Sequence, residues 1–116
     1  MIRQTRAAAA QVEALFEHYL ARDRDEAARN LLRAVGEALD RIEAEPQAGL
    51  PHPRPYPGMA RWGYRWIKVG RYWFGYAVAA DGPVLTNVLY EAADLPGRVA
   101  EADEVIPIPR PGDEPS

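Results

Sequence analysis

The stretch RWGYRWIKVGRYWFGYAV, residues 61–78, decides the fold of this chain. It holds seven of the eleven aromatic residues, and these flank the turn dipeptide Gly70-Arg71, so the two strands of a hairpin are predicted. The same stretch contains no acidic residue, and its four basic residues are Arg61, Arg65, Lys68 and Arg71. A hairpin of this composition fits three roles: a nucleic-acid platform, a catalytic face or a well-filled core.

Side chains alternate along a strand, and this alternation divides the hairpin into two faces. One face of the first strand carries Tyr64, Trp66 and Lys68, and the other carries Arg65, Ile67 and Val69. In the second strand, Tyr72, Phe74, Tyr76 and Val78 lie opposite Trp73, Gly75 and Ala77. We expect one face to be the core, made by Ile67, Val69, Phe74, Tyr76, Leu85 and either Val88 or Leu89. The opposite face should leave three side chains exposed as a binding surface: Trp66, Lys68 and Trp73.

Two helices are predicted before the hairpin. The first begins at Ala7, and its apolar stripe is Val12, Leu15, Phe16, Tyr19 and Leu20. The second begins at Asp23, because Glu26 follows three residues later with the spacing of a capping box. It ends at Glu45, because proline disfavours helical geometry in the residue before it. Its apolar face is Ala28, Leu31, Leu32, Val35, Leu39 and Ile42. The short connection between the helices predicts an antiparallel helical hairpin.

The remaining segments complete an α+β domain of two layers. Residues 1–6 are expected to form an edge strand, residues 46–60 an irregular connector with five prolines, and residues 84–90 a third strand of the sheet. The order β-α-α-β-β-β predicts a helical hairpin packed on a small, mainly antiparallel sheet. Residues 95–102 add a weak helical turn. We expect residues 1–102 to form the domain and residues 103–116 an acidic, proline-rich and flexible tail.

Composition narrows the functional classes. A chain of 116 residues with 47% hydrophobic and 27% charged residues is typical of one soluble globular domain. It has no cysteine and no apolar run near 18 residues, so we expect a cytoplasmic protein without disulfides or a membrane span. The net charge is −3, although residues 46–80 carry five basic and no acidic side chains. Since a generic nucleic-acid binder would be basic overall, direct DNA binding is not expected.

Few side chains could carry chemistry. His18 on a helix and His52 in the connector have no convincing cluster of carboxylates near them, so no metal site is predicted. The only serine is Ser116, and the glycines match no phosphate-loop pattern, so neither a serine nucleophile nor a cofactor is predicted. Glu91 and Asp94 follow the last strand, where they could form a carboxylate pair or, more often, cap a helix or face solvent.

Over residues 2–98 the chain resembles the RelE/ParE superfamily of toxins from bacterial type II toxin–antitoxin modules. The resemblance rests on the element order and on two motifs, Ile42, Pro46 and Gly49 at the end of the second helix and Tyr72 and Tyr76 in the strand YWFGYAV. It implies a small α+β toxin that forms a hetero-oligomer with a cognate antitoxin. The local pattern is closer to the ParE branch, which implies a non-enzymatic inhibitor of DNA gyrase.

The RelE branch implies an alternative, a ribosome-dependent ribonuclease that cuts messenger RNA. Its members carry an arginine after the first tyrosine of the third strand and another past the last strand, where this chain has Trp73 and Ala93. A ribonuclease would therefore have to depend on Arg65, Lys68, Arg71 and Tyr90. The ParE interpretation has no catalytic residue and predicts a partner-binding surface made of Arg61, Arg65, Trp66, Lys68, Arg71 and Trp73. A third alternative is a family member that binds its partner and is not toxic.

Overall fold

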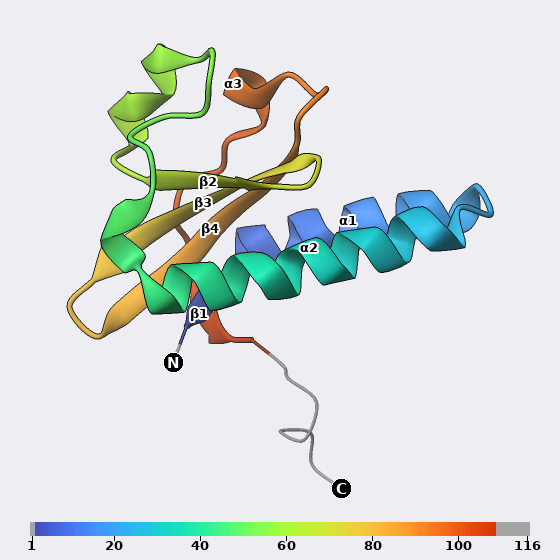
Figure 1. The fold of residues 1–116 in the computed structure, drawn as a ribbon, viewed down its shortest axis with the longest axis horizontal. Helices are drawn as coiled ribbons and strands as arrows, with labels where there is room; N and C mark the ends of the chain where they lie inside the picture. Colours follow the sequence, from blue (N-terminus) through green and yellow to red (C-terminus); the bar gives the residue numbers. More distant parts are fainter. Residues whose placement is uncertain (1, 109–116) are drawn as a thin grey trace, which may run out of the picture.

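The computed structural model describes residues 2–108 and confirms an α+β fold in which a helical hairpin covers one face of a sheet (Figure 1). The elements are β1 (Arg3–Thr5), α1 (Arg6–Ala21), α2 (Asp25–Ala44), two 3₁₀ turns (Pro46–Ala48 and Pro57–Trp62), β2 (Arg65–Val69), β3 (Tyr72–Ala79), β4 (Gly82–Tyr90), α3 (Leu95–Arg98) and β5 (Val105–Pro107). No helix among these residues is long and apolar enough to cross a membrane.

The sheet has five strands in the order β2-β3-β4-β1-β5. Strands β2, β3 and β4 form an antiparallel meander, whereas β1 pairs in parallel with β4. The prediction that the N-terminal strand lies at an edge is wrong, because β5 pairs with β1 on its other side. Strand β5 comes from the segment expected to be a tail, whose residues 109–116 lie outside the described residues. Residues 3–5 and 105–107, which are far apart in the sequence, therefore lie side by side at one end of the sheet.

The helical hairpin begins with a side-chain cap and reverses through a strained residue. Thr5 caps α1, since its Oγ1 accepts a hydrogen bond from the Ala8 amide over 3.1 Å. The predicted cap of α2 at Asp23 is wrong: α2 begins at Asp25, and no side chain caps it. Asp23 instead adopts φ 55° inside the turn, a left-handed conformation that aspartate tolerates better than most residues. Asp23 therefore contributes to the turn between the helices and does not cap α2.

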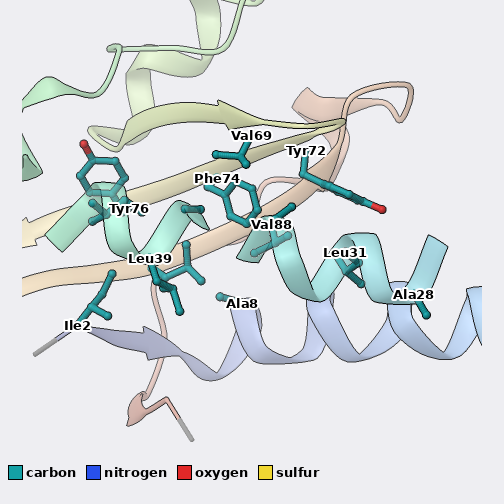
Figure 2. Packing of buried hydrophobic residues seen from close by; sticks show 14 of the residues in the cluster. Ile2, Ala8, Ala28, Leu31, Leu39, Val69, Tyr72, Phe74, Tyr76 and Val88 are labelled. Carbon is teal, nitrogen blue, oxygen red and sulfur yellow. The ribbon is translucent and has the colours of Figure 1, made fainter. Parts of the chain in front are cut away.

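The larger core lies between the hairpin and the sheet. Figure 2 shows Phe74 and Val88 of the sheet pointing toward the helices, where Leu31 and Leu39 meet them. Of the core residues predicted for this face, Val69, Phe74, Tyr76, Leu85 and Val88 are buried in it, whereas Ile67 is only partly buried and packs against it. Leu20 and Leu32, by contrast, are 45% and 50% exposed, although the predicted stripes included them. Each follows a buried residue by one position, which turns it about 100° around its helix and away from the sheet.

The opposite face of the sheet carries a second core, and this corrects the prediction of an exposed binding surface. Trp66 is fully buried and Trp73 is 6% exposed. The 3₁₀ turn Pro57–Trp62 and α3 lie on this face (Figure 1), and they supply Met59 and Leu95 as the buried side chains that cover the tryptophans. Of the three side chains predicted to be exposed here, only Lys68 is exposed.

A β-bulge explains how β4 serves both cores. The register passes from Gly75–Asn87 to Tyr76–Leu85, so Thr86 is an extra residue without a partner on β3. Because of this insertion, Leu85 and Val88 both face the helices although three positions separate them. The bulge was not predicted, and it is why the choice between Val88 and Leu89 could not be made by simple alternation. Leu89 joins the second core.

The tyrosine of β3 explains the proline and glycine of the resemblance motif. The Tyr76 hydroxyl donates to the Pro46 carbonyl over 2.8 Å and accepts from the Gly49 amide over 3.0 Å. A Cβ atom at position 49 would lie 2.5 Å from that hydroxyl and 2.8 Å from the Arg65 Cβ. Glycine is therefore required at position 49 by close approach, and the motif anchors the connector to the sheet.

A buried amide ties the C-terminal segment to the bulge. Asn87 is fully buried; its Oδ1 accepts from the Ala100 amide over 2.8 Å, and its Nδ2 donates to the Ala100 carbonyl over 3.2 Å. Gln11 of α1 completes the arrangement, because it donates to the Asn87 Oδ1 and accepts from the Val88 amide. The hydrogen bonds satisfy polar groups that would be costly to bury unpaired. They also fix residues 98–100 to both the helix and the sheet.

Candidate functional site

A groove of about 890 Å³ lies between the tip of the helical hairpin and the β2–β3 turn. Figure 1 shows that this tip projects past the strands, so the inner side of the hairpin is uncovered there. Tyr19, Tyr72 and Tyr90 line the groove beside the end of the core, and Gly70 and Arg71 line it from the β2–β3 turn. The hairpin is longer than the sheet that it covers, and the groove follows from that difference.

The three tyrosines form one contact group. The hydroxyls of Tyr19 and Tyr72 lie 2.5 Å apart, and the rings of Tyr72 and Tyr90 have centroids 5.8 Å apart. Burial, together with the hydrogen bond between its hydroxyl and that of Tyr19, raises the pKa of Tyr72 far above its ordinary value. Tyr72 is therefore a neutral phenol at physiological pH. It can donate a hydrogen bond or pack against an apolar side chain, but it cannot serve as a base.

Charges of both signs line the groove. The Arg24 guanidinium lies 5.5 Å from the centre of the Tyr19 ring, a cation–π distance, and Arg71 stands on the opposite side. Acidic side chains from the hairpin also line it, namely Asp23, Asp25, Glu26 and Glu37. A groove with aromatic residues and mixed charges suits a polypeptide with polar and apolar side chains better than a uniformly negative phosphate backbone.

The basic residues of β2 are largely engaged within the chain. The Lys68 Nζ lies 2.6 Å from the Glu91 Oε2, and the hydrogen bond from this ammonium lowers the pKa of Glu91. Arg65 donates to the carbonyls of Gln47 over 3.0 Å and Gly49 over 3.4 Å. Both cations thus have partners within the chain, and these partners are different: a carboxylate for Lys68 and backbone carbonyls for Arg65.

The two remaining basic residues predicted for the site are exposed. The Arg61 guanidinium lies 5.5 Å from the centre of the Trp62 ring, on the second core and not at the groove. Arg71 lines the groove itself. Of all the residues predicted for the site, only Arg71 and Tyr90 line the groove, whereas Trp66 and Trp73 are in the second core.

Sequence reasoning missed Tyr19, Arg24 and Tyr72 as groove residues. Tyr19 was predicted on the apolar stripe of the first helix, and Tyr72 was assigned to a strand face and to the resemblance motif; both are buried. The usable signal is position: each lies next to a turn, Tyr19 near the hairpin reversal and Tyr72 directly after Gly70-Arg71. A buried residue beside a turn lies at the end of a core, where grooves open.

A family model described as the ParE toxin of the type II toxin–antitoxin system parDE matches residues 2–90. The chain belongs to the ParE toxin family. No curated protein matches it in sequence. Membership makes this ParE-family chain a toxin of a type II toxin–antitoxin system, and it implies a cognate antitoxin as partner. The match ends at Tyr90, the last residue of β4, so α3 and β5 lie beyond it.

Proposed function

We propose that this chain is a non-enzymatic toxin that inhibits DNA gyrase when free and is neutralised by its cognate antitoxin in the cytoplasm. The observation that carries the proposal is the ion pair between Lys68 and Glu91, whose atoms are 2.6 Å apart. Cleavage of RNA needs cations placed to stabilise charge on a phosphate. In this chain the lysine best placed for that task is neutralised by a carboxylate.

Two further observations support a binding role over a ribonuclease. Trp73 stands where ribonuclease relatives carry an arginine, and it is buried among the side chains that cover the outer face of the sheet. Ala93 stands at the second arginine position and supplies no charge. The alternative ribonuclease would have to work with Arg65, Lys68, Arg71 and Tyr90, of which the first two have structural partners.

We propose that a partner with acidic side chains contacts the exposed cations of this region. Arg61 and Arg71 carry no ion pair among the described residues, and Arg71 lines the groove with the three tyrosines. Arg65 and Lys68 can contribute to the positive potential at the edge of the sheet while they keep their internal contacts. Trp66 and Trp73, both buried, act by holding the surface in place and not by touching a partner.

Supercoiling by purified gyrase tests the toxin proposal. We expect the purified chain to inhibit supercoiling of relaxed plasmid and the antitoxin from the adjacent reading frame to relieve the inhibition. Arg71→Glu should weaken antitoxin binding about 10-fold, the scale of a central charged contact. Arg54→Glu is the matched control, since Arg54 is also exposed but lies in the connector. Normal supercoiling at a large excess of the chain, with normal growth when it is expressed alone, would exclude a gyrase inhibitor.

The two alternative functions, a ribonuclease and a non-toxic binding protein, predict different results in cells that express the chain alone. A ribonuclease would produce cuts at ribosomal A-site codons, visible by primer extension and abolished by Lys68→Ala. Glu91→Gln should increase such cutting, because it frees the lysine. A family member that only binds would form the antitoxin complex and leave growth, messenger RNA and supercoiling unchanged.

A further inference from the structure

The back of the helical hairpin carries an apolar groove that the toxin proposal does not use. It lies on the other side of the hairpin from the tyrosine groove and has a volume of about 360 Å³. Six of its lining side chains are apolar and two are polar. They are Ala9, Val12, Phe16, Leu32, Val35 and Ile108, with Gln4 and Glu13. Val12, Phe16 and Val35 are only half-buried.

A protruding leucine stands at the rim of this groove. Leu32 of α2 is 50% exposed although it is a large apolar side chain at the centre of a long helix. Leu20, on α1, is 45% exposed, and it follows Phe16 by one helical turn. Isolated exposed leucines are ordinary, but two leucines beside a half-buried apolar groove form a contiguous patch, and such patches mark contact surfaces.

The groove and its rim are complementary to each other. A two-fold arrangement of two chains can place Leu32 of each copy in the groove of the other, so the same patch serves both sides of the contact. Among the residues that the structure describes, Glu13 is the only charged side chain in the lining, and it lies on α1. Arg29 is exposed one turn before Leu32 on α2, so it would approach with Leu32 and face the partner's acidic rim.

We propose that the back of the helical hairpin is the interface of a symmetric dimer of this chain. The apolar patch supplies the contact, and the pairing of Glu13 with Arg29 across the two-fold axis supplies the orientation. Both copies keep the tyrosine groove free, because the two grooves share no lining residue. The dimer does not depend on gyrase inhibition, so each proposal can fail without the other.

The size of the surface sets the strength of this dimer. Helices of 16 and 20 residues are about 24 and 30 Å long, and two adjacent helices are about 20 Å wide, which gives on the order of 500 Å² per copy. Stable interfaces bury about 800 Å² per partner. We therefore expect a weak dimer that forms in the micromolar range and is disrupted by a single charge in its centre.

Sedimentation velocity of the full chain from about 1 μM to 1 mM tests the interface. The mass should rise with concentration from 12.9 kDa toward twice that value. Leu32→Asp should remain a monomer at about 1 mM, a loss of at least about 100-fold in affinity, because the charge would have to be buried. Val78→Asp is the control: Val78 is 41% exposed on β3 and does not line the apolar groove, so its change should leave association unaltered.

A charge exchange tests the geometry. Glu13→Arg alone and Arg29→Glu alone should each weaken association about 10-fold, and the double variant should recover most of it. Circular dichroism of each variant verifies folding, which these exposed positions should not disturb.

Several results would overturn the proposal. A chain that stays monomeric at about 1 mM has no such dimer, and association unaffected by Leu32→Asp uses another surface. Loss of association on removing residues 109–116 would assign it to the end of the chain. If Leu32→Asp weakens binding of the antitoxin in a monomeric chain, then the patch belongs to the antitoxin.

Discussion

The two faces of the sheet are covered in different ways, although each carries a core of buried side chains. On one face, two long helices place side chains such as Leu31 and Ile42 against the strands at regular helical intervals. On the other face, a 3₁₀ turn and a four-residue helix cover Trp66 and Trp73 with a few large side chains. The first covering repeats a pattern and the second does not. Burial therefore depends on side-chain volume, whereas periodicity is only one way to deliver it.

This contrast has a physical origin in the backbone. A helix satisfies its own hydrogen bonds, so its side chains alone decide where it packs. The irregular cover has only short hydrogen-bonded turns, such as the one from the Met59 amide to the Tyr56 carbonyl, and it depends on individual contacts as well. These include the Leu50–Trp66 backbone pair, the Tyr76 hydroxyl on Gly49, and the Asn87 amide on Ala100. If these contacts are strong enough, the irregular cover unfolds in the same cooperative transition as the helices.

The largest effects should come from removing the central aromatic residue of each face. Trp66→Ala and Phe74→Ala should each destabilise the protein by about 3–5 kcal/mol, because both side chains are fully buried. Urea unfolding followed by circular dichroism measures both. Trp66→Phe is a milder control, since it keeps most of the packing and removes an indole N–H that has no hydrogen-bond partner among the described residues. A cost below about 1 kcal/mol for Trp66→Ala would separate the irregular cover from the cooperative unit.

A smaller effect is expected from Asn87→Ala, which removes the clamp, that is, the two hydrogen bonds that tie Ala100 to the sheet. The change leaves the Ala100 amide without its acceptor and takes away one partner of Gln11, at about 2 kcal/mol. Hydrogen exchange should show faster exchange at Ala100 while amides in the centre of β3 keep their relative protection. If Ala100 exchanges no faster than before, the segment is held by packing and the clamp is incidental.

Thr5→Ala probes the regular side at its start. The variant loses the cap of α1, in which the threonine oxygen accepts from the Ala8 amide, and should cost about 1 kcal/mol. The effect should be below that of Asn87→Ala, because a long helix spreads its support over many contacts. Thr5→Ser keeps the capping oxygen and is the control. A larger loss from Thr5→Ala than from Asn87→Ala would reverse the order of dependence between the two faces.

The smallest effect is expected at the rim, where Glu91 meets Lys68. The pKa of Glu91 is lowered from its ordinary value of 4.5 by the hydrogen bond from Lys68. A lowered folded pKa stabilises the fold above the unfolded pKa, and this contribution is lost as the pH falls through the folded value. Stability measured by urea between about pH 3 and 7 should therefore fall less on acidification in Glu91→Gln. Glu104→Gln, which removes the exposed pair with Arg6, gives a matched comparison. If wild type and Glu91→Gln lose stability equally on acidification, then the ion pair contributes nothing measurable to the free energy of unfolding.

The sequence predicted one face well and the other poorly, for reasons that particular residues make clear. The hairpin strands and the buried residues Phe74 and Tyr76 followed from alternation, and the two helices followed from their apolar stripes. Trp66 and Trp73 were expected to be exposed because nothing in a proline-rich connector announces that Met59 will cover them. The bulge at Thr86 was invisible for a similar reason, since one inserted residue leaves no mark in composition.

The candidate site was predictable only in part. Arg71 and Tyr90 were selected from the sequence, and both line the tyrosine groove. The groove itself depends on how far the helical hairpin projects past the sheet, which is a property of three-dimensional length and not of any motif. Tyr19 enters the site from a helix that lies more than fifty residues earlier in the chain than Tyr72. Contacts of such separation are set by topology and are not visible to local pattern reading.

The position of β1 has a consequence for how the protein is made. Residues 3–5 are synthesised well before their partners, which are residues 84–85 of β4 and residues 105–107 of β5. At about 5–20 residues per second, the first strand waits on the order of 5–20 s for the last one. The helical hairpin can form during that interval, because its contacts are local. The five-stranded sheet can be completed only after residue 107 has been synthesised, so β1 lacks both of its neighbouring strands while the helical hairpin forms.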